Sequence, residues 1–457
     1  MENMNEITIK VLDEKRFNAI AAYTRSPAAA YVSNELAWFS NEGETILGVL
    51  LLDTIDDDYV SIVLGQDEAG RFRAFDVESF PDQESAVSWL HNTMKWHTLN
   101  SPPLFPQGDN PKALDLFTPI VPPEKQHVYF RRLISDAAFL PAREMIGRMM
   151  PYYVDVDGNF VEQFQSTGFD SRVWELCLYA YFTEEELFLK REYNAPDFVV
   201  MKYGETVAIE AVIVGRKSDN PPRYLRTTPI HKTAKEVMIE HENAMPIRFG
   251  SPLYTKLQKK YWELPHVTGN PIVFAIADFH DDQSMLWSST ALINYLYGYR
   301  HDFHYDDEGH LIIEPKKIES HKVGEKEIPS GFFFQPGTEN ISAVLFSASG
   351  TISKFNRMGR QAGFKDPSVL MIREGTCHNH DPNAAIPKMF MYEVDEKSRE
   401  TWGEGFSMYH NPNALLPVPE HLFPSIGHHH LRDGLIVSTL PEFYPYASYT
   451  LNLHFKK

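Results

Sequence analysis

The sequence predicts an α+β protein of several units that contains one α/β core. Two observations lead to this prediction. Between about Phe160 and Tyr297, a helical pattern is followed by three short strand patterns, a second helix and a buried strand, which gives the order α-β-β-β-α-β. On either side of this core, the first 110 residues carry several strand patterns and one helix, and residues 301–457 are rich in proline and histidine. A chain of 457 residues is too long for one hydrophobic core. We therefore expect an acidic α+β domain at 1–110, a linker and helical bridge at 111–168, the core at 169–300 and a mixed region at 301–457.

In the N-terminal unit, period-two apolar patterns predict strands and one segment has helical spacing. Within Gln83–His97, the residues Ala86, Leu90 and Met94 recur on one helix face. Asn100–Lys125 is rich in proline and is expected to be a linker. The expected elements are strands at 6–12, 45–54, 59–66 and 71–80, and helical structure over 126–155.

The core elements follow in the order given above, and the region after them has fewer signals. In residues 301–457, only 341–348 has a clear strand pattern. The expected core elements are a helix at 171–186, strands at 187–193, 197–203 and 206–214, a helix at Pro252–Leu264, a strand at Asn270–Phe279 and a helix at 288–299.

The composition excludes several classes of protein. Hydrophobic residues make up 43% of the chain and charged residues 23%, as in ordinary globular proteins. Apolar runs such as Thr45–Leu52 are far shorter than the roughly 20 residues of a membrane span. The first residues are acidic and polar, unlike a secretory segment, and two cysteines, Cys177 and Cys377, exclude a disulfide framework. We expect a cytoplasmic protein with no membrane partner.

The charge of the chain is unevenly distributed. The net charge of −19 argues against a protein coated in nucleic acid. Residues Asn41–Leu90 contain twelve Asp or Glu against Arg71 and Arg73, so the N-terminal domain offers an acidic surface to a protein partner. Residues Val214–Lys260 contain ten Lys or Arg against four acids, so a nucleic-acid surface is expected there. Homo-oligomer formation is left open.

Three carboxylates stand in surroundings that disfavour charge. Glu175 lies in a helical run that is apolar on every side, and Glu210 is the only ionisable residue of the strand at 206–214. Asp197 follows Pro196 at the start of its strand. A buried carboxylate costs several kcal/mol unless it is paired or metal-bound, and three acids brought together would bind Mg²⁺ or Mn²⁺. Each acid also has a structural alternative: an ion pair with Arg172 for Glu175, an ion pair for Glu210 and a turn for Asp197.

With these residues in this order, the segment Ser171–Phe279 resembles the PD-(D/E)XK, or restriction-endonuclease-like, nuclease superfamily. The resemblance rests on Pro196-Asp197 at the head of the second strand, on Glu210 in the third strand and on Glu175 in the first helix. It covers about a quarter of the chain, and its motif is short. It implies a restriction-endonuclease-like core that hydrolyses phosphodiester bonds, mostly in DNA, with Mg²⁺ bound by Asp197, Glu210 and Glu175.

The sequence departs from this motif at Val212, where the superfamily carries a lysine. Side chains alternate along a strand, so Val212 points the same way as Glu210 and the lysine position is apolar. Lys217 is not a simple substitute for the missing lysine, because the strand is expected to end at Gly215, before Lys217. Members of the superfamily are known to place the lysine elsewhere, often on the following helix.

The helix expected over Pro252–Leu264 offers the replacement. On a helical wheel, Lys260 lies about 55° from the centre of the apolar face, Lys256 about 95°, and Lys259 nearly opposite. Tyr261 belongs to the apolar face itself. Lys260 is therefore the first candidate for the catalytic lysine and Lys256 the second, with a solvated flank as the alternative for all three lysines.

Basic residues follow the strand that carries Glu210, where contacts with phosphate groups would be useful. A second group, Lys354, Arg357 and Arg360, recurs every third residue and would line one side of a helix. Solvated surface charge is the alternative for both groups. The candidate nucleic-acid-binding residues are Arg216, Lys217, Arg223, Arg226 and Lys256.

Two other clusters suggest metal sites less specifically. Ala277–Asp282 ends a strand with Asp-x-His, a pair used by metallophosphoesterases, but the partner motifs of that family are missing. Cys377–Asp381 and the histidines His428–His430 match no structural zinc spacing, and a surface loop is expected for them.

The function that the resemblance implies is a Mg²⁺-dependent nuclease, of the endonuclease class, that acts on DNA. By analogy, its setting would be restriction or anti-phage defence. The second hypothesis is a non-catalytic binding or assembly module that kept the fold and lost the motif lysine.

Overall fold

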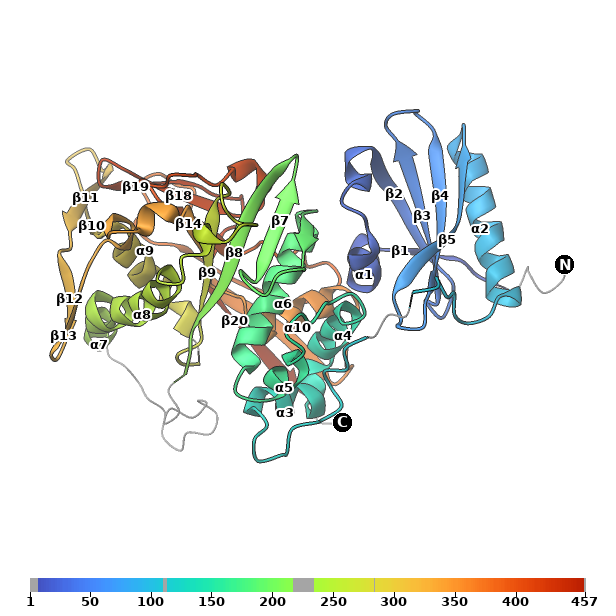
Figure 1. Cartoon of the computed structure of the whole chain (residues 1–457), viewed down its shortest axis with the longest axis horizontal. Helices are drawn as coiled ribbons and strands as arrows, with labels where there is room; N and C mark the ends of the chain where they lie inside the picture. Colours follow the sequence, from blue (N-terminus) through green and yellow to red (C-terminus); the bar gives the residue numbers. More distant parts are fainter. Residues whose placement is uncertain (1–6, 110–112, 217–233, 283, 456–457) are drawn as a thin grey trace.

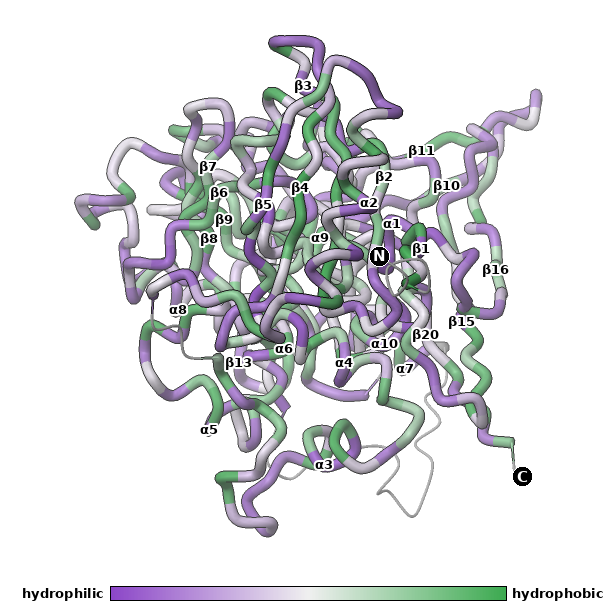
Figure 2. The backbone as a smooth tube through the Cα atoms, turned by 90° about the vertical axis from the view of Figure 1, so that its right-hand side faces the viewer, coloured by the Kyte–Doolittle hydropathy of each residue, from purple (hydrophilic) through white to green (hydrophobic). Residues whose placement is uncertain are grey.

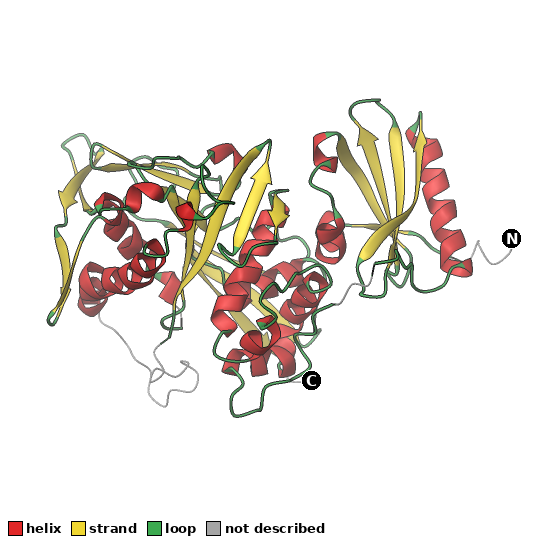
Figure 3. Cartoon of the chain, in the orientation of Figure 1, coloured by secondary structure: helices red, strands yellow, loops and turns green. Residues whose placement is uncertain are grey.

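The computed structural model describes residues 7–109, 113–216, 234–282 and 284–455. An N-terminal unit built on one sheet lies beside a larger part built on a second sheet (Figure 1). Helices cover the faces of both sheets, which places the chain in the general α+β class (Figure 3).

The N-terminal unit is a five-stranded antiparallel sheet with the spatial order β1-β2-β3-β4-β5. Its strands alternate apolar side chains between two small cores: Leu47 and Val49 face helix α1, while Ile46 and Leu50 face helix α2. The elements are β1 (Lys10–Leu12), α1 (Glu14–Ala21), β2 (Ser33–Ser40), β3 (Ile46–Asp53), β4 (Tyr59–Gln66), β5 (Phe72–Phe80) and α2 (Gln83–Asn100).

The strands expected at 45–54, 59–66 and 71–80 and the helix from Gln83 are confirmed. The sequence patterns missed α1 and β2. Strand β2 has a register shift between Glu35 and Ala37, which interrupts the period-two pattern by which a strand is recognised. Helix α1 is only 8 residues long and begins at the cap Asp13, whose side chain accepts a hydrogen bond from the amide of Lys15.

Helix α1 also joins the N-terminal unit to the rest of the chain. It packs against α4 and α10. The Arg16 guanidinium donates to the carbonyl of Ala362 at 3.2 Å, and the Lys15 ammonium donates to the carbonyl of Ser398 at 3.1 Å. The expected helical bridge is present as α3 (Val128–Ser135) and α4 (Leu140–Met149).

The larger part contains an eight-stranded mixed sheet. Strands β8 and β9 are parallel, as are β9 and β14, and β6, β7 and β8 form an antiparallel meander. The strands in spatial order are β19 (Leu435–Thr439), β18 (Gly427–Arg432), β17 (Phe406–His410), β14 (Ala343–Ser347), β9 (Ile272–Asp278), β8 (Glu205–Val214), β7 (Phe198–Lys202) and β6 (Phe188–Lys190).

Two hydrophobic cores cover the faces of this sheet. On β9, Val273 and Ala275 join the core that contains α6, while Phe274 and Ile276 join the core that contains α8 and α9. All residues of β9 are buried, which explains its continuous apolar run. Strands β8 and β9 are largely hydrophobic along the chain, whereas outer strands such as β10 are largely hydrophilic (Figure 2). The helices of this part are α5 (Phe160–Gln165), α6 (Phe169–Glu184), α7 (Ala234–Ile239), α8 (Met245–Leu257), α9 (Ser289–Tyr297) and α10 (Ile352–Gln361).

The expected elements occur in the chain order α6-β6-β7-β8-α8-β9, with an additional helix α7 and a π-helical turn, Glu240–Ala244, between β8 and α8. The sheet does not end there, because β14, β17, β18 and β19 extend it beyond residue 300. The sequence predicted only one clear strand after residue 300, and the structure has several more. The further strands are β10 (Tyr299–Tyr305), β11 (Leu311–Lys317), β12 (Ser320–Val323), β13 (Lys326–Pro329), β15 (Val369–Cys377), β16 (Lys388–Glu393) and β20 (Pro445–His454).

Within the described ranges, no helix has both the length and the apolar character needed to cross a membrane. Cys177 and Cys377 are both buried free thiols.

Candidate functional site at the β7–β8 hairpin

Asp197 and Glu210 are brought together by the pairing of β7 with β8. Phe198 pairs with Ile209, so the residue before β7 lies beside the middle of β8. The amide of Asp197 donates to Glu210 Oε2 at 3.3 Å, and the amide of Ala211 donates to Asp197 Oδ2 at 2.8 Å. The two carboxylates predicted from the sequence are therefore neighbours in one small site.

The electrostatics of this pair disfavour two negative charges. Burial, together with the nearby carboxylates of Glu210 and Glu175, raises the pKa of Asp197 from its ordinary 3.8 to about 8. Glu210 is itself 4% exposed. A divalent cation would remove this repulsion, because it binds carboxylates in their charged form.

Glu175 lies close enough to act on both acids but is held by an arginine. Arg172 Nη1 lies 2.9 Å from Glu175 Oε1 and 2.7 Å from Oε2, and Arg172 Nη2 donates to Asn159 Oδ1 at 3.0 Å and to Gln163 Oε1 at 2.7 Å. Burial raises the pKa of Glu175, and Arg172 opposes this rise. The structural alternative for Glu175, an ion pair with Arg172, is thus present.

The three acids do not converge on one point. In the described part of the chain, the one group of three His, Cys, Asp or Glu residues with ligand atoms within 4.8 Å of one another lies elsewhere, at His410, Glu420 and His430. The geometry brings Asp197 and Glu210 together and leaves Glu175 beside them in its ion pair.

The expected position of the catalytic lysine changes. Helix α8 ends at Leu257, so the helix predicted over Pro252–Leu264 was wrong at both ends. Lys260 has a left-handed backbone with φ 51°, and its ammonium pairs with Glu263 at 3.3 Å with 56% of the side chain exposed. The structure therefore does not bring Lys260 to the carboxylates.

Lys256, the second candidate, is the lysine that reaches the site. Its Nζ forms an ion pair with Glu210 Oε1, and its side chain is 25% exposed. It comes from the last turn of α8, which packs on the same sheet face as Glu210. Val212 is buried in that core, as the alternation along β8 predicted.

Tyr261 is a site residue that the sequence patterns missed. Its hydroxyl donates to Glu210 Oε1 at 2.6 Å, beside the ammonium of Lys256. Burial and the charge of Glu210 raise the pKa of Tyr261 well above its ordinary value. The apolar spacing assigned this ring to the core correctly, but spacing carries no information about where a hydroxyl points.

The candidate nucleic-acid residues other than Lys256 separate into two groups. Arg216 pairs with Asp170 at 3.1 Å and with Asp282 at 2.6 Å, and its guanidinium lies 5.3 Å from the ring centre of Tyr129. It is thus held by two carboxylates of its own chain. Lys217, Arg223 and Arg226 lie outside the described residues.

The other basic and metal-like groups have structural surroundings. Lys354 and Arg357 are 0% and 2% exposed, so they do not form a surface for nucleic acid. Asp278 and His280 contact each other through Oδ1 and Nδ1 at 2.7 Å in a buried position. The histidines His428–His430 lie in strand β18, so the expectation of a surface loop there was wrong.

Comparisons of the chain with protein-family models, with curated proteins and with solved structures gave no match.

Proposed function

We propose that the protein is a metal-dependent nuclease that hydrolyses phosphodiester bonds in DNA, with a restriction-endonuclease-like core. The observation that carries the proposal is the contact of Lys256 with Glu210, next to Asp197. An acid at the head of one strand, an acid in the next strand and a lysine at the second acid form the set that the sequence motif requires. Here the lysine comes from α8, while Val212 packs in the core.

The donor atoms of the site suit Mg²⁺ or Mn²⁺. Glu210 Oε1 already accepts from Lys256 and Tyr261, whereas Oε2 accepts only the 3.3 Å bond from the amide of Asp197 among the described residues. Asp197 Oδ2 accepts from Ala211, and since no described residue donates to Oδ1, that oxygen is left for a cation. Hard oxygen donors of this kind select Mg²⁺ and Mn²⁺. Such a cation would supply an activated water and polarise the phosphate.

The chain's own residues have separate roles in this proposal. Asp197 and Glu210 hold the cation, and the Lys256 ammonium places a positive charge where a phosphate would approach. Tyr261 orients Glu210 through its hydroxyl. Glu175, compensated by Arg172, acts through its charge on Asp197 and not by direct ligation. Restriction or anti-phage defence in the cytoplasm is the setting that fits such an activity.

The test is cleavage of plasmid and single-stranded DNA with Mg²⁺ or Mn²⁺. We expect cleavage that stops with EDTA and falls by at least about 100-fold in Asp197→Ala and in Glu210→Ala, because the cation loses a ligand. Glu263→Ala, which alters only an exposed ion pair, is the matched control and should cleave as the wild type does. Cleavage that survives both active-site changes would refute the assignment.

A non-catalytic module is the second candidate, and one observation favours it. Both an ammonium and a hydroxyl of the chain already donate to Glu210 Oε1, so this oxygen has its hydrogen-bond partners and a counter-charge from the chain itself. A module predicts metal-independent DNA binding and no cleavage of either DNA form. The same assay, read together with a gel-shift measurement in EDTA, separates the two functions.

A further inference from the structure

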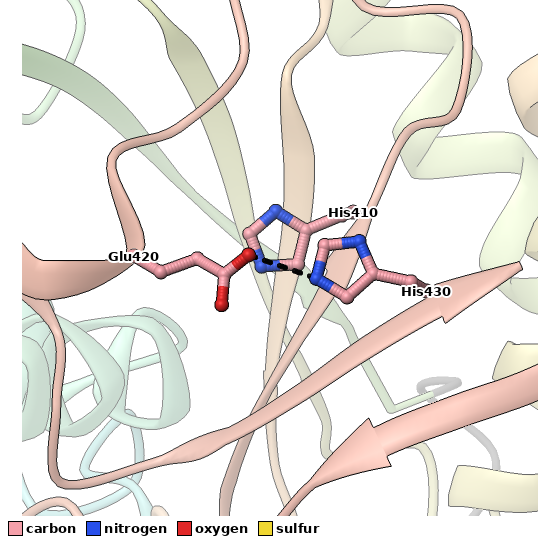
Figure 4. Close-up of side chains that lie close together, drawn as sticks. All are labelled: His410, Glu420 and His430. Carbon is pink, nitrogen blue, oxygen red and sulfur yellow. Dashed lines mark ion pairs between the residues drawn. The ribbon is translucent and has the colours of Figure 1, made fainter.

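A second cluster of ligand-type side chains lies at the opposite end of the large sheet from β7. His410 is the last residue of β17, and His430 lies in β18. The strands are parallel with Tyr409 paired to His429, so His410 and His430 are lateral neighbours on one sheet face. Glu420 begins the short 3₁₀ turn Glu420–Leu422 in the connection between the two strands. The three side chains point toward one another (Figure 4).

The distances suit a shared cation. One ligand atom from each of His410, Glu420 and His430 lies within 4.8 Å of the others. The two imidazole rings stack at 4.3 Å with an interplanar angle of 7°, and His430 Nε2 lies 2.9 Å from Glu420 Oε1. Ligands of a tetrahedral Zn²⁺ are about 3.3 Å apart, given bond lengths of about 2.0–2.2 Å. Small side-chain rotations would therefore close the group around one ion.

His410 has the outer hydrogen bond that metal-binding histidines use. His428 Nε2 lies 2.9 Å from the carbonyl of Phe423, and a carbonyl only accepts, so this nitrogen carries the proton. With the proton on Nε2, the Nδ1 of a neutral His428 ring carries the lone pair. His410 Nε2 lies 2.9 Å from that Nδ1 and therefore donates to it. The lone pair of His410 is then on Nδ1, the ring nitrogen that remains as its ligand atom.

The backbone of the site is also fixed. The Tyr297 hydroxyl lies 3.0 Å from the carbonyl of His410 and 2.8 Å from that of His429. One O–H is thus shared between the end of β17 and the middle of β18. This contact keeps the two histidine-bearing strands in register, so the ligands on them are held before any ion binds.

We propose that His410, Glu420 and His430 bind a divalent transition-metal ion of the Zn²⁺ class. Two imidazoles and one carboxylate favour zinc, whereas Mg²⁺ prefers oxygen ligands only. His410 is buried, but 31% of the His430 side chain and 47% of the Glu420 side chain are exposed. Solvent can therefore reach the ion, and water completes its coordination. The ion ties the connection 411–426 to the sheet and stabilises the fold by binding the native state only.

The site is separate from the proposed nuclease centre, and its test is independent of cleavage. The full chain is stripped with EDTA, dialysed and titrated with Zn²⁺, with bound metal measured by mass spectrometry and the melting temperature recorded. We expect the wild type to bind one Zn²⁺ per chain. His430→Ala and Glu420→Gln should bind it with an affinity at least about tenfold weaker. Zn²⁺ should raise the melting temperature of the wild type and have a smaller effect on both variants.

His421→Ala is the matched control, because this exposed histidine is next to Glu420 in sequence but pairs with Glu205 at 2.7 Å. It should bind Zn²⁺ as the wild type does. Asp197→Asn should also retain this ion. The proposal is overturned if the wild type binds no Zn²⁺, if Glu420→Gln and His430→Ala bind it unchanged, or if Asp197→Asn removes the ion instead.

Discussion

Glu210 determines the balance of charge in the candidate site. One oxygen accepts from Lys256 and Tyr261, and the other accepts from the amide of Asp197. The sequence identified Asp197 and Glu210 because an acid in an apolar strand stands out from its neighbours. It did not identify Lys256 as the first choice or Tyr261 at all. Both depend on where α8 ends. The helical wheel assumed that the helix continues through Lys260, whereas α8 stops at Leu257.

The raised pKa of Asp197 predicts how stability depends on pH without metal. The folded chain keeps a proton on Asp197 up to about pH 8, whereas the unfolded chain loses it near 3.8. Folding therefore takes up a proton between these values, and this contribution to stability is lost as pH rises from about 4 to 8. Asp197→Asn has no such proton, so its unfolding free energy should not fall in this way. The difference in unfolding free energy, variant minus wild type, should increase as pH rises, by on the order of 1 kcal/mol or more.

Urea unfolding of both proteins in EDTA at several pH values measures this difference. Mg²⁺ should restore the stability of the wild type at pH 8 and leave Asp197→Asn unchanged. A difference between the two proteins that does not vary with pH would show that Asp197 is ionised in the fold.

Tyr261→Phe removes one hydrogen bond to a buried carboxylate and keeps the ring. We expect it to lower the unfolding free energy by about 1.5–3 kcal/mol, the usual range for hydrogen bonds to charged groups. Tyr254→Phe, on the exposed side of α8, is the control and should change it by less than about 0.5 kcal/mol. Equal effects of the two changes would argue against the contact with Glu210.

At the scale of elements, helix α10 shows how a charge pattern can mislead. Lys354 and Arg357 recur as a surface stripe would, yet both are buried against Glu400. Arg373 from β15 joins the same carboxylate at 3.3 Å and also pairs with Glu404. Glu400 lies about 45 residues after Lys354 and Arg357 in the sequence, so no local sequence pattern predicts the contact. The predicted surface stripe is therefore wrong for Lys354 and Arg357, which belong to a buried ion-pair network.

Glu400→Gln should be strongly destabilising, because three buried cations lose their shared carboxylate. We expect a loss of about 3–5 kcal/mol in unfolding free energy, as for other broken buried ion networks. Glu396→Gln removes an exposed pair with Lys365 and should cost less than about 1 kcal/mol. Denaturant unfolding of both variants compares them, and similar small losses would mean that the network contributes little.

The packing of α10 on α4 predicts opposite effects for two helical glycines. A Cβ at Gly359 would lie 2.2 Å from the carbonyl oxygen of Pro141, whereas a Cβ at Gly147 would meet only Phe117 at 3.5 Å. Gly359→Ala should therefore destabilise by about 1–3 kcal/mol despite the higher helix propensity of alanine. Gly147→Ala should stabilise by up to about 1 kcal/mol. Thermal melts of the two variants give the signs, and a stabilised Gly359→Ala would contradict the close packing.

At the scale of the whole molecule, one sheet runs through the expected core and the region after it. The order of elements from α6 to β9 was predictable, because each has a strong local pattern. The place of β14, β17 and β18 was not, since strand pairing between distant segments leaves no periodic signal. Residues 343–346 of β14 pair with β9. Residues 169–300 alone would therefore lack the strand that covers one edge of β9.

This continuity predicts which fragments fold. A chain truncated after residue 300 should be unfolded or aggregated, because β9 would become an apolar open edge. The fragment 1–109 should fold alone, since its sheet has its own two cores. Circular dichroism and thermal melts of both fragments decide this. A cooperative melt of the truncated chain would contradict the single-sheet description.

The most direct test of the central claim compares two lysines in one DNA cleavage assay with Mn²⁺. Lys256→Met should reduce the initial rate by about 100-fold or more, because the positive charge at Glu210 is lost. Lys260→Met should stay within about twofold of the wild type, because that lysine pairs only with exposed Glu263 among the described residues. Full activity in Lys256→Met, or a loss confined to Lys260→Met, would contradict the account.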